Sequence, residues 1–150
     1  MARLTAEEML ARARRRLERL SPGDALAAQR DGGALLVDVR AHDERVREGV
    51  IPGSLHVPRT VLEWRLDPAS SYRNPYACDL ARRVIVVCSD GYSSSLAAAT
   101  LQGLGHDGAT DVVGGFRAWS AAGLPVVAGP SEPDDPPGMG VPFPPPRTRG

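Results

Sequence analysis

The fold is decided by the stretch Val84-Ile-Val-Val-Cys88-Ser-Asp-Gly91-Tyr-Ser-Ser-Ser-Leu96. Its first four residues are apolar and β-branched, which predicts a buried strand, and residues 96–104 have the pattern of a helix. A short loop that begins with Cys88 joins the two elements. At such a strand-to-helix turn, the loop N–H groups and the helix N-terminus favour an anion, which here would be a thiolate.

Two interpretations of Cys88 follow from this stretch alone. Unpaired amides at a helix N-terminus lower the pKa of a cysteine thiol, so Cys88 is a candidate nucleophile. Gly91 suits a tight turn with positive φ, and the serines at 93–95 are able to cap the helix and to donate hydroxyl protons to a charged sulfur. The alternative is a buried cysteine that ends a core strand, because cysteine is among the most buried residue types.

The composition is that of an ordinary globular protein, with 42% hydrophobic residues among 150. The 18 basic and 18 acidic residues balance, so we expect no nucleic acid and no membrane as partner, and we interpret the arginines of residues 12–19 as a solvated helix face. No apolar run approaches the roughly 20 residues of a membrane span, and the first residues lack the apolar core of a signal peptide. Two cysteines are too few for a disulfide scaffold, so we expect a cytoplasmic location.

Helices and strands alternate along the chain, which predicts an α/β fold with a mainly parallel sheet flanked by helices on both faces. Strands are expected at 34–39, 54–57, 84–87 and 111–113, and helices at 96–104 and 116–122. Capping boxes at Thr5–Glu8 and Thr60–Glu63 predict two more helices, the first reaching Leu20, and Ser21 caps another that ends at Gly33. Residues 41–53 are polar and end in a turn, and residues 67–80 form a surface connection.

These elements divide the chain into three regions. Residues 1–33 form N-terminal helices that pack on a domain spanning 34–127. Eight of the 14 prolines lie in residues 128–150, which have almost no large apolar side chains. Such a segment buries too little surface to offset its ordering entropy, so we predict a disordered tail there.

Two residues outside the loop each allow two interpretations. Asp38, near the carboxyl end of a strand, is either ion-paired with Arg40 or part of a site at the strand ends; we favour the pair, because an unpaired buried carboxylate is costly. Cys78 is either a resolving partner for an oxidised Cys88 or a bystander, and we favour the bystander.

Four groups of residues are informative through their order and spacing along the chain. They are Leu36-Val-Asp-Val-Arg40, Ile51-Pro-Gly53, Val84-Ile-Val-Val-Cys88 with Gly91 and Ser94, and Gly114-Gly-Phe-Arg-Ala-Trp119 with Ala122-Gly-Leu-Pro125. Together they resemble a single-domain rhodanese, a sulfurtransferase-like protein, over residues 34–127. The resemblance implies the rhodanese fold and a persulfide on Cys88. It further implies that the persulfide is held by the active-site loop, which consists of Ser89, Asp90, Gly91, Tyr92, Ser93 and Ser94.

The loop departs from many active members of this family in its charge. Ser93 stands where arginine is common, and position 90 is aspartate. A thiolate at 88 beside a carboxylate at 90 would repel thiosulfate, a dianion. We therefore expect weak use of thiosulfate and better use of neutral persulfides or of a persulfidated protein, unless a supporting arginine folds over the site, the candidates being Arg40, Arg59 and Arg65. No metal or organic cofactor is expected, since His42, His56 and His106 show no ligand spacing.

Three hypotheses of function remain. In a sulfurtransferase, the Cys88 thiolate attacks the outer sulfur of a donor, the loop amides hold the persulfide, and an acceptor nucleophile removes the sulfur. A cysteine phosphatase or arsenate-reducing enzyme needs arginine where Ser94 stands, so we favour it least. A non-catalytic binding or sulfur-carrying module would use the N-terminal helices or the proline tail to recruit a partner.

Overall fold

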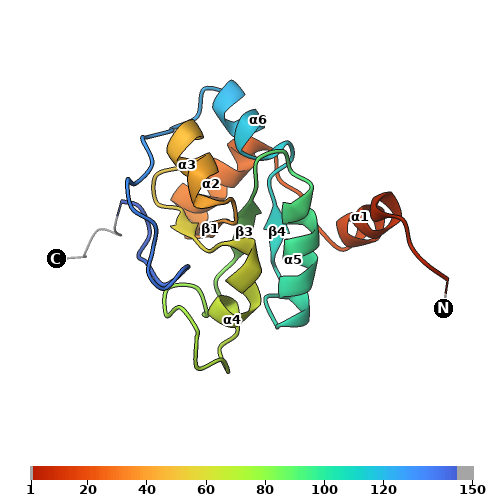
Figure 1. Cartoon of the computed structure of the whole chain (residues 1–150). Helices are drawn as coiled ribbons and strands as arrows, with labels where there is room; N and C mark the ends of the chain where they lie inside the picture. The colour runs from red at the N-terminus through yellow and green to blue at the C-terminus, as the bar shows by residue number, and fades with distance from the viewer. Residues whose placement is uncertain (1, 145–150) are drawn as a thin grey trace.

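A parallel sheet between two layers of helices forms the centre of the computed structural model, which describes residues 2–144 (Figure 1). In this part of the chain the sheet has four strands in the order β2-β1-β3-β4. They are β1 (Leu35–Asp38), β2 (Leu55–His56), β3 (Val84–Val87) and β4 (Thr110–Asp111). Each pairs with its neighbour in parallel. The predicted α/β fold with a parallel sheet flanked by helices on both faces is confirmed.

The two faces of the sheet bury two separate apolar clusters. Alternate residues of β1 and β3 point to opposite faces, as the strand period requires. One face packs against α4 (Leu62–Leu66) and α5 (Ser93–Gly103), and the other against α2 (Pro22–Gly32) and α6 (Gly115–Ala121). The longest of these helices has eleven residues, and no helix in residues 2–144 has both the length and the apolar character to cross a bilayer.

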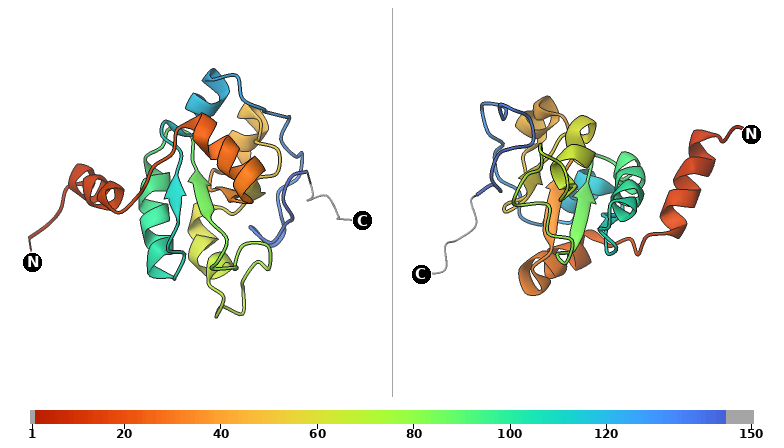
Figure 2. Two further views of the ribbon diagram at one scale, coloured as in Figure 1. Left: turned by 180° about the vertical axis from the view of Figure 1, so that it is seen from behind. Right: turned by 90° about the horizontal axis from the view of Figure 1, so that it is seen from below.

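The N-terminal helix α1 (Ala6–Arg15) packs against the outer side of α5 (Figure 2). It begins with the predicted capping box, in which Thr5 and Glu8 bond each other's backbone. The helix ends at Arg15, earlier than the predicted Leu20. Leu20 instead forms a parallel bridge to Val112 beyond the end of β4, so residues 17–20 lead the chain onto the edge of the sheet.

Helix α3 (His42–Glu48) occupies a region that we had expected to be only polar and turn-like. Ala41, which precedes the helix, has no side chain that could cap it. The Glu44 carboxylate supplies only the reciprocal half of a capping box, since its Oε1 accepts a hydrogen bond of 3.1 Å from the Ala41 N–H. The helix was missed because position 41 lacks the Ser, Thr, Asp or Asn that marks a helix start in a sequence.

The predicted capping box at Thr60–Glu63 is wrong. A 3₁₀ turn, η1 (Arg59–Val61), precedes α4, and no side chain caps either element. Glu63 instead pairs with Arg59 at 2.7 Å.

The start of the expected disordered tail, residues 128–144, lies along the domain on the side opposite α1 (Figure 2). Val127 and Phe143 form antiparallel bridges to Val50 and Ser54. The side-chain amide of Asn74, which is fully buried, donates to the carbonyls of Gly138 (2.8 Å) and Gly140 (3.2 Å), and Arg65 Nε donates to Pro137 O (2.9 Å). These bonds hold a segment that has little apolar surface of its own. Residues 145–150 of the predicted tail lie outside the described residues.

Asp38, at the carboxyl end of β1, forms the predicted pair with Arg40 and a second pair with Arg45. Arg40 Nη2 lies 2.9 Å, and Arg45 Nε 3.0 Å, from Asp38 Oδ2. All three side chains are buried. Burial alone would raise the pKa of Asp38, but the hydrogen bonds and charges of the two arginines outweigh it and lower that pKa.

Replacing Asp38→Asn should destabilise the protein by about 3–5 kcal/mol, because two buried guanidinium groups lose their counter-charge. Chemical denaturation with the exposed Asp31→Asn variant as control measures this difference. The folded state favours the Asp38 carboxylate, so its contribution is present above the unfolded pKa of about 3.9 and is lost as the pH falls through the lower folded value. The stability of Asp38→Asn should therefore lack the part of the acid-induced loss that comes from protonating Asp38. Equal stability of Asp38→Asn and the control would contradict the argument.

Candidate active site

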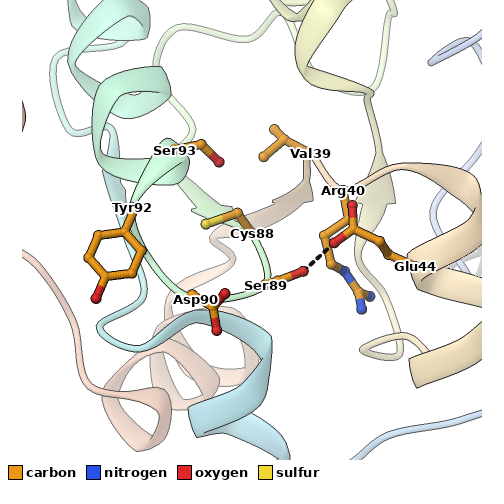
Figure 3. Close-up of a pocket in the computed structure, with 8 residues that line it drawn as sticks. All are labelled: Val39, Arg40, Glu44, Cys88, Ser89, Asp90, Tyr92 and Ser93. Carbon is orange, nitrogen blue, oxygen red and sulfur yellow. Dashed lines mark hydrogen bonds between the residues drawn. The ribbon is translucent and has the colours of Figure 1, made fainter. Parts of the chain in front are cut away.

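A cavity of about 250 Å³ opens at the carboxyl ends of β1 and β3 (Figure 3). This edge is where parallel α/β sheets bind ligands. The lining residues come from the segment after β1, from α3 and from the loop between β3 and α5. They are Val39, Arg40, Glu44, Cys88, Ser89, Asp90, Tyr92 and Ser93.

The sulfur of Cys88 lies on the floor of this cavity, with 6% of the residue exposed. The Gly91 N–H reaches Sγ at 3.1 Å and the Ser94 N–H at 3.4 Å. Burial alone would raise the pKa of the thiol, but hydrogen bonds from the loop, among them those of the Ser93 hydroxyl and of the Gly91 and Ser94 N–H groups, outweigh it, and the pKa of Cys88 is lowered. The structure therefore provides the amide cradle that the sequence predicted around a thiolate.

The first two carbonyl groups of the same loop are bonded by the N-terminal part of α6. The Phe116 N–H donates to Cys88 O at 2.8 Å, and the Arg117 N–H donates to Ser89 O at 3.1 Å. The loop and the start of α6 approach each other so closely that both need glycine. A Cβ on Gly91 would lie 2.8 Å from Gly114 N, and one on Gly115 would lie 2.8 Å from Gly91 N. Gly91 also has the expected positive φ, at +84°.

The serines at 93–95 do not cap α5, which corrects the prediction made for them. The residue that precedes α5 is Tyr92, and no side chain caps the helix. Ser94 Oγ and Ser95 Oγ donate to Asp111 Oδ2 at 2.7 and 2.8 Å. The single proton of the Ser94 hydroxyl is thus bound to Asp111. The backbone N–H groups and the hydroxyl of Ser93 are the donors that remain for a charged sulfur.

Glu44 is a pocket residue that the sequence analysis missed. Its Oε2 accepts a hydrogen bond of 2.5 Å from Ser89 Oγ, which links α3 to the loop (Figure 3). That bond is the main cause that lowers the pKa of Glu44, against a smaller opposing effect of burial. The cavity wall therefore carries a carboxylate in addition to that of Asp90.

Asp90 and Tyr92 lie at the mouth of the cavity. Asp90 Oδ1 is 3.1 Å from Arg117 Nη1, but both side chains are largely exposed, so water weakens this pair. Tyr92 is 62% exposed.

Of the three candidate supporting arginines, only Arg40 lines the cavity. Its guanidinium is bonded to Asp38, to Glu48 Oε2 at 3.3 Å and to Gly49 O at 2.8 Å, and it stacks on the Phe116 ring at 4.0 Å. Every guanidinium nitrogen thus has a partner. Arg59 pairs with Glu63, and Arg65 bonds Tyr72 O and Pro137 O, so the structure places neither in the cavity.

Cys78 is half-buried and does not line the cavity, and in residues 2–144 both cysteines are thiols. Across the same described range, no group of three or more His, Cys, Asp or Glu side chains is arranged to hold a metal ion. Among the described residues that line the cavity, Cys88 is the only thiol.

Comparison with known proteins agrees with the fold. The model of the rhodanese-like domain family matches residues 21–122, which include α2 but not α1. The thiosulfate sulfurtransferase GlpE of Pseudomonas savastanoi pv. phaseolicola is 37% identical over 100 residues, covering 67% of this chain and 85% of that protein. The GlpE of Pseudomonas syringae pv. syringae is 39% identical over 98 residues, covering 65% and 83%.

Two solved structures have a similar fold. A protein of unknown function from Rhodopseudomonas palustris, described as a possible tyrosine phosphatase, has a TM-score of 0.77 at 34% identity and covers 85% of this chain and 97% of its own. The human single-domain sulfurtransferase TSTD1 has a TM-score of 0.60 at 26% identity, covering 69% and 95%. The chain therefore belongs to the rhodanese-like family and is a rhodanese-like sulfurtransferase.

Cys88 should react with iodoacetamide at a lower pH than an unperturbed thiol, whose pKa is about 8.5. The lowered pKa leaves more thiolate at neutral pH, and the thiolate is the reactive form. Mass spectrometry of the alkylated peptides as a function of pH gives the midpoint for Cys88 separately from Cys78. A midpoint at or above 8.5 would show that the amides do not stabilise the thiolate.

Proposed function

We propose that this protein transfers sulfane sulfur through a persulfide on Cys88. The observation that supports the proposal is the set of N–H groups directed at Sγ at the floor of an open cavity. The same donors would hold the anionic outer sulfur of a persulfide, as an oxyanion hole holds an oxyanion. An amide-lined thiolate that a donor can reach through an open cavity is the nucleophile that such transfer requires.

The transfer proceeds by two displacements. The Cys88 thiolate attacks the outer sulfur of a donor persulfide, a new S–S bond forms, and the bond to the donor breaks with release of the donor thiolate. An acceptor thiolate or cyanide then attacks the outer sulfur of the Cys88 persulfide, and the Cys88 thiolate leaves. No electrons are exchanged with an outside agent, because each step replaces one nucleophile on sulfur by another.

The charges around the cavity favour neutral persulfides, of small thiols or of a protein, over thiosulfate. Glu44 and Asp90 supply two carboxylates beside the thiolate. The guanidinium of Arg40 is engaged by Asp38, Glu48 and Gly49. A dianion would therefore meet three negative groups without an unengaged cation on the cavity wall.

A phosphatase or arsenate-reducing activity has less support, although one structural relative is described as a possible tyrosine phosphatase. A tetrahedral oxyanion is held most effectively by a bidentate guanidinium. Ser94 stands at the position of that arginine, and its hydroxyl is bonded to Asp111.

Incubation with a low-molecular-weight persulfide should add one sulfur atom to the intact protein, as read by mass spectrometry. Cyanide or a thiol should reverse the gain, and Cys88→Ala should abolish it, because the mutant has no nucleophile in the cavity. Cys78→Ala is the matched control and should load normally. A folded protein that gains no sulfur from any donor would overturn the proposal and favour the non-catalytic binding module.

The double substitution Glu44→Gln and Asp90→Asn should improve thiosulfate as a donor by about 10-fold in the rate of sulfur loading, since it removes two like charges near the incoming dianion. Loading from a neutral persulfide should change much less. Asp31→Asn, which removes an exposed carboxylate on α2 away from the cavity, is the control. If the double variant changes both donors equally, the charge argument is wrong.

A further inference from the structure

Two arginines that precede the region matched by the family model converge on the active-site loop. Arg14 Nη2, from α1, donates to Gly91 O at 2.8 Å, and Arg19 Nη2 donates to the same oxygen at 3.0 Å. Both contacts are partly buried. The sequence analysis assigned these arginines to a solvated helix face, and the structure corrects that assignment.

The carbonyl that they hold belongs to the same peptide group as the Tyr92 N–H. In a trans peptide the C=O and the N–H point in opposite directions, and this peptide is trans. With Gly91 O fixed on the side of α1, the Tyr92 N–H is turned away from α1, into the loop. Gly91 and Ser94 already direct their N–H groups at Sγ there. No hydrogen bond from the Tyr92 N–H is found within residues 2–144, so this donor is available to an outer sulfur.

The network behind the loop also carries an excess positive charge. Arg19 forms two hydrogen bonds, of 2.9 and 3.2 Å, to the fully buried Asp111, so these two charges offset each other. Arg14 is bonded to Gly91 O and, at 3.2 Å, to Ser95 Oγ, and its guanidinium lies 5.5 Å from the centre of the Tyr92 ring. It has no carboxylate among these partners. A cation on a carbonyl oxygen polarises the peptide and strengthens its N–H as a donor.

We propose that Arg14 and Arg19 are positioning residues for sulfur transfer, which hold the Gly91 carbonyl so that the Gly91–Tyr92 peptide presents its N–H to a charged sulfur on Cys88. This inference rests on the proposed role of Cys88 as the nucleophile. It assigns to the N-terminal segment a part in the chemistry, beyond its packing on α5. That packing does not depend on Arg14 alone, because Ala13 is buried against the domain.

The test compares Arg14→Gln and Arg14→Met with Arg14→Lys, which keeps the charge. The first two variants remove the excess positive charge behind the loop and free the Gly91 carbonyl, so we expect the pH midpoint of Cys88 alkylation to rise by about 0.5 to 1 unit. That shift corresponds to a rate about 3- to 10-fold lower at a pH below both midpoints. Above the midpoints the rates should converge with that of the parent protein. Arg14→Lys should recover most of the shift.

Arg15→Gln is the matched control, because it removes the same charge from the same helix at an exposed position. It should keep the midpoint of the parent protein. The inference is overturned if the midpoint is unchanged in both Arg14→Gln and Arg14→Met, if their rates fall equally at every pH, or if Arg15→Gln shifts the midpoint as far. Circular dichroism shows that each variant is folded. A parent protein that gains no sulfur contradicts the proposed function instead, whatever the midpoints.

Discussion

The outward anchoring of the loop carbonyls is the constraint on which the active site depends. The carbonyls of Cys88 and Ser89 are bound by N–H groups of α6, and that of Gly91 is bound by Arg14 and Arg19. Because the two ends of a peptide group point in opposite directions, this anchoring turns the N–H groups of Ser89, Asp90 and Tyr92 away from α6 and α1. The loop held in this way keeps two further N–H groups, those of Gly91 and Ser94, within hydrogen-bond distance of the buried sulfur, in place of the water it has lost.

This arrangement explains how a cysteine that is 6% exposed can serve as a nucleophile. Burial alone stabilises the neutral thiol, which is inert, whereas the loop reverses the sign of that effect by supplying hydrogen bonds to the anion. The carboxylates of Glu44 and Asp90 act in the other direction on whatever approaches. The cavity therefore stabilises its own anion without attracting other anions, and in the proposed function this difference is the basis for discrimination between donors.

The parts of the structure that could be predicted are those encoded locally. The β-branched run of residues 84–87, the turn at Gly91 and the alternation of elements were enough for the sheet and for the position of Cys88. The parts that were missed depend on residues distant in sequence. Arg14 meets Gly91 O across 77 positions and Ser89 meets Glu44 across 45, and neither spacing has a periodic signature. Helix α3 was missed because Ala41, the residue before it, has no side chain that could cap it.

The bonds between Asn74 and the segment near Gly138 have a consequence for the order of folding. The amide of Asn74 is fully buried, and its acceptors lie 64 and 66 positions later in the chain. During synthesis, the sheet and its helices are complete once residue 121 has emerged, but this amide remains unpartnered until residues 138–140 follow. Loop closure over such a separation is slow compared with local contacts. The C-terminal segment therefore closes onto the domain after the strands have been made, and until then the Asn74 amide can bond only water or other acceptors.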